Sequence, residues 1–233
     1  MARPTKRLHI SEGGTVDIPG KTLPVFVGEA QEVFYVHENL LRNGSSEYFK
    51  KLLQYGGETW HSKPIDLSHE DVPTFRLFNK WLYDGSLLPK DDAASISDRD
   101  FRLLVNACAF GERLRDIPFT KAITDAIIDC HNKIKAVPGP VLITSFYEAT
   151  DDSCPVRQLF ADMWAFLAKD EWIEQKLSQC PRGFVEDLVR AYHKHRYCFS
   201  TDNPLPWSES REQYYRLLDA TPTENPCEKF DQE

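Results

Sequence analysis

The chain has 233 residues, of which 41% are hydrophobic, 12% aromatic and 27% charged, a composition typical of a globular protein with one or two domains. Its 28 basic and 36 acidic residues leave a formal net charge of −8, which argues against a broad basic surface for nucleic acid or for an anionic membrane. No stretch approaches the roughly 20 apolar residues of a membrane-spanning helix. No apolar signal-peptide core follows the basic residues Arg3, Lys6 and Arg7. We therefore expect no membrane insertion, no secretion, no direct nucleic-acid binding, and a cytoplasmic or nuclear location, or both.

The first predicted element is a β-hairpin. Residues 1–21 form a polar leader that we expect to be flexible. Runs of β-branched and aromatic residues at 23–27 and 32–36 then flank a four-residue loop that begins with Gly28, a pattern that predicts two antiparallel strands.

Helical spacing follows the hairpin. After His37 the apolar residues recur at three- and four-residue intervals with a break at Asn43-Gly44, which predicts two short helices. A short strand is predicted at 64–67. The segment from Ser68 to Asp71 then starts a helix that ends near Gly85.

Two longer helices complete the first unit. Their apolar residues recur at helical spacing over 101–108 and, after Pro118, over 119–130. Cys108 and Cys130 fall on these apolar faces, and the six cysteines of the chain are widely scattered, so we interpret them as reduced thiols. Residues 22–136 thus have an α+β layout in which helices outnumber strands.

The clearest break in the chain is Val137-Pro138-Gly139-Pro140, and we place a boundary there. Residues 137–200 are predicted to form an all-helical extension. One helix follows the start signal at Asp151-Asp152-Ser153, and another follows Pro181. With only two or three helices, this extension is expected to pack on the first unit. Residues 201–233 contain eight acidic and three basic residues and are predicted to form a flexible acidic tail, in which only the region of Tyr214 and Tyr215 suggests a docking turn.

Several motifs of the first unit occur together and in order. Phe34-Tyr35-Val36-His37 precedes Leu40 and Ser46-Glu47-Tyr48-Phe49, and Ile65-Asp66-Leu67 precedes Asp71-Val72-Pro73-Thr74-Phe75 and Trp81-Leu82-Tyr83-Asp84-Gly85. This series resembles the BTB/POZ domain, and it covers about residues 22–132. The resemblance implies a small sheet flanked by helical hairpins. The whole chain looks like the stand-alone BTB proteins of filamentous fungi. The residues that carry the resemblance are Phe34, His37, Leu40, Ser46, Phe49, Asp71, Phe75, Trp81, Leu82, Tyr83 and Gly85.

We expect structural roles for these residues. His37 lies where a strand meets a helix, and its imidazole can satisfy free backbone groups there. Ser46 is predicted to cap the helix that carries Phe49, while Phe75 and Leu82 are predicted to lie in the core together with Phe78.

No residue is assigned to catalysis, a cofactor or a metal. The segment from Gly14 to Lys21 has the wrong spacing for a phosphate-binding loop, and a strand follows it instead of a helix. His193 and His195 point about 200° apart on a helix, so they cannot easily share a metal ion with Cys198. We interpret them as part of a solvated, basic helix end. No serine lies in a nucleophile elbow, and we do not expect an enzyme.

Three functions remain open. The first is a non-enzymatic protein-interaction module that assembles with itself or recruits partners. The resemblance implies homodimerisation, yet residues 1–22 contain no convincing counterpart of the N-terminal helix used in the usual interface. The second is a substrate adaptor of a cullin-based ubiquitin ligase. The extension suits this role, but the expected hydrophobic-x-Glu element is absent because Gly56 precedes Glu58 by two positions. The third is a transcriptional co-regulator that acts through a DNA-binding partner.

Overall fold

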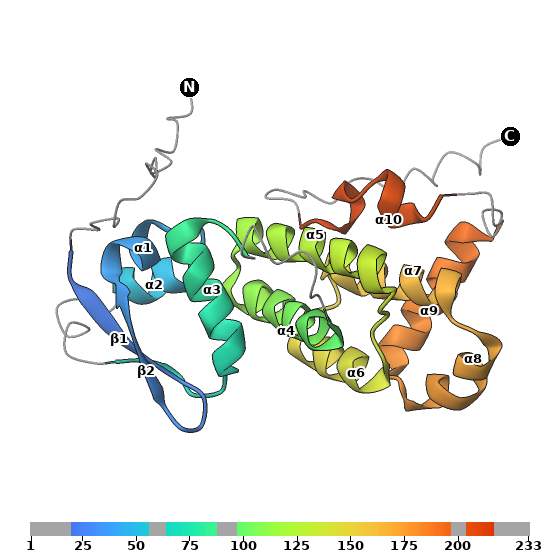
Figure 1. Ribbon diagram of the computed structural model, residues 1–233, viewed down its shortest axis with the longest axis horizontal. Helices are drawn as coiled ribbons and strands as arrows, with labels where there is room; N and C mark the ends of the chain where they lie inside the picture. The colour runs from blue at the N-terminus through green and yellow to red at the C-terminus, as the bar shows by residue number, and fades with distance from the viewer. Residues whose placement is uncertain (1–19, 56–63, 88–96, 197–203, 217–233) are drawn as a thin grey trace, which may run out of the picture.

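The chain folds into an elongated α+β structure with its sheet at one end and a group of helices at the other (Figure 1). This computed structural model describes residues 20–55, 64–87, 97–196 and 204–216. Most of the leader lies outside these ranges, as do residues 201–203 and 217–233 of the tail. None of the helices within the described ranges combines the length and apolarity needed to cross a membrane.

The sheet has three strands in the order β2-β1-β3. Strands β1 (Thr22–Val27) and β2 (Glu32–His37) are antiparallel and are joined by the predicted four-residue loop, in which Gly28 has a φ of 74°. Strand β3 (Ile65–Leu67) pairs in parallel with β1. The alternation of side chains directs Leu23, Val25 and Val27 into the core. The predicted hairpin and short strand are confirmed.

Three helices pack near the sheet, and their ends agree with the signals in the sequence. They are α1 (Glu38–Asn43), α2 (Glu47–Tyr55) and α3 (Val72–Asp84). The Asp71 side chain caps α3 by accepting a hydrogen bond of 3.2 Å from the Thr74 amide. Gly85 ends α3 in the left-handed conformation, with a φ of 64°, and its amide donates to the Trp81 carbonyl.

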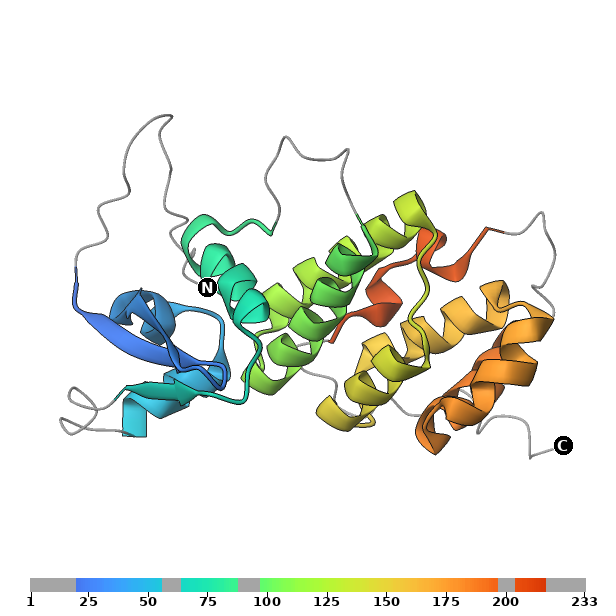
Figure 2. The same cartoon turned by 60° about the horizontal axis from the view of Figure 1, so that its bottom comes forward.

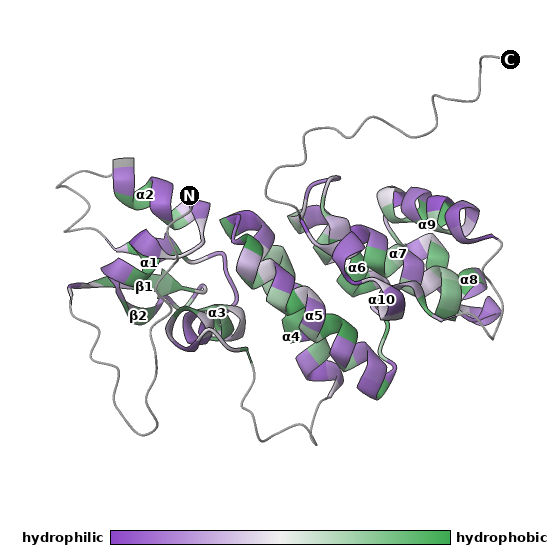
Figure 3. Cartoon of the chain, turned by 90° about the horizontal axis from the view of Figure 1, so that it is seen from above, coloured by the Kyte–Doolittle hydropathy of each residue, from purple (hydrophilic) through white to green (hydrophobic). Residues whose placement is uncertain are grey.

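Helices α4 (Asp98–Leu114) and α5 (Ile117–Ile134) form a hairpin in the middle of the molecule. Hydrophobic residues recur along both helices (Figure 3), and those predicted to face the core are buried except Ala126, which is half-buried. The two helices approach closely at Gly111. A Cβ atom there would lie 2.6 Å from Oγ1 of Thr120.

The extension contains more helices than the two or three expected. They are α6 (Pro140–Ala149), α7 (Pro155–Leu167), α8 (Asp170–Lys176), the 3-10 turn η2 (Leu177–Gln179) and α9 (Arg182–His195). Neither α6 nor α8 has a hydrogen-bonded side-chain cap at its N-terminus, so this signal was not available to predict the two helices. Asp151 accepts from the Ser153 amide in the preceding turn, so α7 begins later than the predicted start signal, at Pro155.

The extension packs on the first unit, as expected. Helix α6 contacts α4 of the first unit, and the buried side chains of both helices belong to the same apolar cluster. One continuous apolar cluster includes buried residues of the sheet, of α3 to α7 and of α9. The two parts therefore share a core.

The prediction of a flexible tail from residue 201 was wrong for residues 204–216, which we call the C-terminal strap. The strap contains α10 (Pro206–Glu209) and the 3-10 turn η3 (Glu212–Tyr214), and it runs alongside α5 (Figures 1 and 2). The side chains of Trp207 and Tyr214 are fully buried in the shared core. Two large aromatic anchors thus outweigh the polar, proline-rich composition that suggested disorder.

Candidate interaction surfaces

The residues that carry the sequence motifs meet inside the first unit. Nδ1 of His37 lies 2.7 Å from the hydroxyl oxygen of Tyr83, and the ring of Phe34 lies 5.0 Å from that of Phe75. The tyrosine hydroxyl also accepts from the backbone amide of His37 across 3.2 Å. At this strand–helix junction the Tyr83 hydroxyl therefore serves both the backbone amide and the imidazole of His37.

Ser46 joins α2 to the end of α4. Its hydroxyl oxygen accepts from the Phe49 amide across 3.3 Å, which confirms the predicted cap, and it donates to the Leu114 carbonyl across 2.9 Å. Phe49 in turn stacks on Phe78, with ring centroids 5.9 Å apart. This contact fixes α2 against α3.

The remaining motif residues also contribute to packing or to helix ends. Trp81 contacts Phe119 of α5, with ring centroids 5.9 Å apart. Leu40 and Leu82 are only half-buried, so the prediction of Leu82 as a core residue holds only in part. Together these motif residues fix the sheet and α1 to α5 to one another, and they leave the outer face of the sheet to other side chains.

On β1 and β2 that outer face is apolar, and the exposed Asp66 of β3 lies beside Phe26 at its edge. Pro24 and Phe26 of β1 point away from the core and lie directly opposite Tyr35 and Val33 of β2. Val33 is 45% exposed and Tyr35 is 69% exposed. We call these four residues the outer sheet face. Adjacent exposed apolar side chains of this kind are typical of protein-binding surfaces.

The C-terminal strap is fixed by a buried carboxylate that sequence reasoning missed. Asp162 of α7 is fully buried and accepts from the hydroxyl of Tyr214 across 2.7 Å. Its second oxygen accepts from Nε2 of Gln158 across 2.6 Å and lies 3.2 Å from Nε2 of His195. His195 is buried, so the prediction of a solvated histidine was wrong at this position, whereas His193 is exposed.

Two arginines attach the strap to acidic side chains of the hairpin. Arg211 donates to Asp129 across 2.7 Å, and Arg216 donates to Glu112 across 2.6 Å. The hydroxyl of Tyr215 donates to Asp125 across 2.5 Å. The predicted docking role of the tyrosine region is therefore confirmed for Tyr214 and Tyr215.

A histidine–tryptophan contact completes the attachment. The rings of His131 and Trp207 lie 5.5 Å apart and nearly perpendicular. Nδ1 of His131 lies 2.7 Å from the Ala136 carbonyl, which assigns the ring proton to that nitrogen. Within the described residues, Nε2 of His131 and Nε1 of Trp207 are buried without a hydrogen-bond partner. Burial lowers the pKa of His131, which keeps the imidazole neutral.

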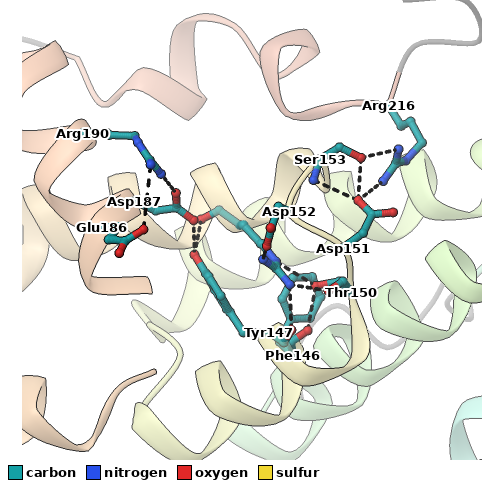
Figure 4. Close-up of polar contacts among 11 residues, drawn as sticks. Phe146, Tyr147, Thr150, Asp151, Asp152, Ser153, Glu186, Asp187, Arg190 and Arg216 are labelled. Atoms are coloured by element: carbon teal, nitrogen blue, oxygen red, sulfur yellow. Dashed lines mark hydrogen bonds and ion pairs between the residues drawn. The ribbon is translucent and has the colours of Figure 1, made fainter. Parts of the chain in front are cut away.

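A second polar network connects the extension internally (Figure 4). The buried guanidinium of Arg157 lies 4.4 Å above the ring of Tyr147, and it donates to the carbonyls of Tyr147 and Thr150. The Tyr147 hydroxyl donates to Asp187 of α9 across 2.8 Å. Arg216 of the strap joins the same region through Asp151. The network therefore links α6, α7 and α9, and the strap bonds separately to the adjoining turn at Asp151.

Two cysteines, Cys108 and Cys154, are buried in the shared core. Burial raises the pKa of the Cys154 thiol to about 12, and burial also raises the pKa of the fully buried Cys108 well above its ordinary value. Both thiols are consequently held in the protonated, unreactive form. In the described ranges no three His, Cys, Asp or Glu side chains are grouped so that they could hold a metal ion. Cys198 lies outside those ranges.

No family model matches the chain, and no curated protein matches it.

Proposed function

We propose that the protein is a non-enzymatic protein-interaction module with a BTB/POZ-like first unit. The arrangement of a hairpin, two short helices, a short parallel strand and three longer helices supports this assignment. Contacts between residues far apart in the motif series, such as His37 with Tyr83, support it as well.

The observation that carries the interaction role is the outer sheet face. Tyr35 and Val33 expose apolar surface to solvent beside Pro24 and Phe26, on the side of the sheet that faces away from the core. Burial of this face against another protein would release the water that covers it. The partner is either another protein or a second copy of the chain.

The test compares charge substitutions at two exposed apolar positions. Three tagged chains would be expressed in the source organism and purified: the wild-type chain, Tyr35→Glu and the control Val141→Glu. Val141 is 81% exposed on α6, far from the sheet in sequence and fold. We expect Tyr35→Glu, but not Val141→Glu, to lose at least about 90% of the recovered partner, because a buried unpaired carboxylate opposes association. Equal recovery with both variants would remove the proposal.

Light scattering separates self-assembly from recruitment. A single chain has a mass of 26.9 kDa. A doubled mass at micromolar concentration that returns to the single mass in Tyr35→Glu supports assembly through the outer sheet face. A single mass throughout assigns the face to a different protein.

A ligase-adaptor role is a second candidate, favoured by the helical extension that follows the first unit and packs on α4 through α6. Glu58, the residue considered for the hydrophobic-x-Glu element, lies outside the described residues. Co-purification of a cullin with the full chain under mild conditions is the expected result. A chain that recovers no cullin contradicts this role and leaves the wider interaction proposal in place.

A further inference from the structure

The end of the molecule opposite the sheet carries an open groove between α8 and α9 (Figure 1). Its volume is about 480 Å³. Helix α8 and η2 contribute Ile173 and Leu177, while α9 contributes Val185, Val189 and Tyr192. Val189 is 63% exposed and Tyr192 is 37% exposed. The groove therefore presents apolar surface to solvent, and we call it the α8–α9 groove.

The spacing of the lining residues determines the shape of the groove. Positions 170, 173, 174 and 177 recur at i, i+3, i+4 and i+7, and positions 185, 188, 189 and 192 recur in the same way. Each helix thus directs one continuous stripe toward the groove. A channel between two such stripes is the kind of surface on which the side-chain ridge of a third helix packs.

The charged side chains that line the groove are acidic. Asp170 and Glu174 are its two charged lining residues, and both are exposed on α8. Neither carboxylate has an ion-pair partner in the part of the chain that the structure describes. Asp170 and Tyr192 line the groove together, and burial, followed by the charge of Asp170, raises the pKa of Tyr192. The nearby cation Lys176 instead lies over the ring of Trp172, 4.3 Å from its centroid.

We propose that the α8–α9 groove binds an amphipathic helix of a partner protein, one whose apolar stripe is flanked by lysine or arginine. The apolar stripe fills the channel between Leu177 and Val189. The flanking cations neutralise Asp170 and Glu174. This site lies on the extension and does not depend on the assignment of the first unit.

The proposal is tested with two fluorescein-labelled helical peptides of about 18 residues, a length at which isolated helices form. Both peptides carry leucine at i, i+3, i+4 and i+7, and one is flanked by lysine and the other by glutamate. Fluorescence anisotropy with the full chain measures each affinity. We expect the lysine peptide to bind about fivefold more tightly, since two partly exposed ion pairs contribute that order of preference.

Two variants locate the binding. In the double variant Asp170→Asn/Glu174→Gln, both peptides should still bind, and their affinities should become about equal. Val189→Glu should weaken the lysine peptide by about tenfold or more, because the carboxylate enters the apolar channel. Val189 is exposed, so this change leaves the fold intact, and Val141→Glu is the matched control on α6.

Equal binding of both peptides by the wild-type chain, no binding at all, or equal effects of Val189→Glu and Val141→Glu would overturn the proposal. A dimer in light scattering that only Val189→Glu dissociates would also overturn it, because a second copy would then occupy the groove. None of these results bears on the outer sheet face, whose test is Tyr35→Glu.

Discussion

The hydroxyl group of Tyr214 donates a hydrogen bond of 2.7 Å to Oδ2 of Asp162, although the two residues are 52 positions apart in the sequence. Asp162 is fully buried in α7, and Tyr214 is fully buried in the C-terminal strap. A buried carboxylate requires such partners, because its desolvation is costly. The bond therefore holds the strap in place and also offsets part of the desolvation cost of burying Asp162.

Replacement of Tyr214 by phenylalanine should destabilise the chain by about 1.5 to 3 kcal/mol, the range for a buried hydrogen bond to a charged group. The variant keeps the aromatic ring and removes one oxygen. Urea unfolding of the full chain gives the free energy of unfolding. Tyr35→Phe, which changes an exposed tyrosine, is the control and should stay within about 0.5 kcal/mol of wild type. Equal stability of the two variants would contradict the anchoring role of Tyr214.

His131 predicts a pH dependence. Its pKa in the folded chain is lowered by burial, while that of an unfolded histidine is about 6.5. Above about pH 6.5 both states are neutral and the full stability is present. Below it, the unfolded state takes up a proton that the folded state resists, so stability is lost as the pH falls from about 6.5 toward the folded pKa.

The measurement is the free energy of unfolding at about pH 7.5 and 5.5. The loss due to His131 cannot exceed about 1.4 kcal/mol per pH unit within the window. His131→Gln should lose less stability over this interval than wild type, whereas His193→Gln, at an exposed position of α9, should retain the wild-type loss. Equal losses in all three chains would exclude His131 as the source.

The cap of α2 provides a third prediction. Ser46→Ala removes the acceptor for the Phe49 amide and the donor to the Leu114 carbonyl. We expect a loss of about 1 to 2 kcal/mol in the free energy of unfolding, because caps of this type contribute that amount. Ser178→Ala, at an exposed position in η2, should change it by less than about 0.5 kcal/mol. Thermal unfolding that gives both variants the same midpoint would contradict this role of Ser46.

Local signals in the sequence were sufficient to predict the strands and helices of residues 22–134. The hairpin, the cap at Asp71 and the stop at Gly85 each depend on residues within a few positions of one another. The pairing of His37 with Tyr83 was not predictable in this way, because it joins positions 46 apart. A strand–helix junction indicates a need for a hydrogen-bond partner, but it does not specify which distant side chain supplies it.

The same limit explains the error in the tail. Composition favoured disorder from residue 201, since proline and acidic residues are frequent there. Trp207 and Tyr214 reverse that tendency because two buried aromatic side chains contribute several kcal/mol of apolar burial. The residues that contact them, such as Asp162 of α7, lie far away in the sequence. The pattern of α7 alone therefore does not indicate that Asp162 bonds Tyr214.

Arg157 and Asp152 form one ion pair, but we expect their substitutions to change the free energy of unfolding by different amounts. Arg157 is buried, while Asp152 is fully exposed and 2.5 Å away. Arg157→Lys should lose about 1 to 3 kcal/mol, since a compact ammonium does not reproduce the separate, coplanar donors with which the guanidinium serves Thr150 and the Tyr147 carbonyl. Asp152→Asn should change the free energy of unfolding by less than about 0.5 kcal/mol, because solvent screens its charge. A larger loss in Asp152→Asn than in Arg157→Lys, measured by urea unfolding, would contradict this assignment.

Gly111 predicts a steric limit on the contact between α4 and α5. An added Cβ atom would lie 2.6 Å from Oγ1 of Thr120 and 2.9 Å from Cδ1 of Phe119, and both side chains are buried. Helix propensity alone favours alanine over glycine by about 1 kcal/mol. A net loss in Gly111→Ala, which we expect to be about 1 to 3 kcal/mol, therefore requires overlap within the core. At Gly183 in α9 the nearest atom, Cδ1 of Tyr147, would be 3.5 Å away, so Gly183→Ala should be neutral or stabilising by up to about 1 kcal/mol. Urea unfolding that showed a gain for both variants would mean that α4 and α5 can separate at Gly111 without cost.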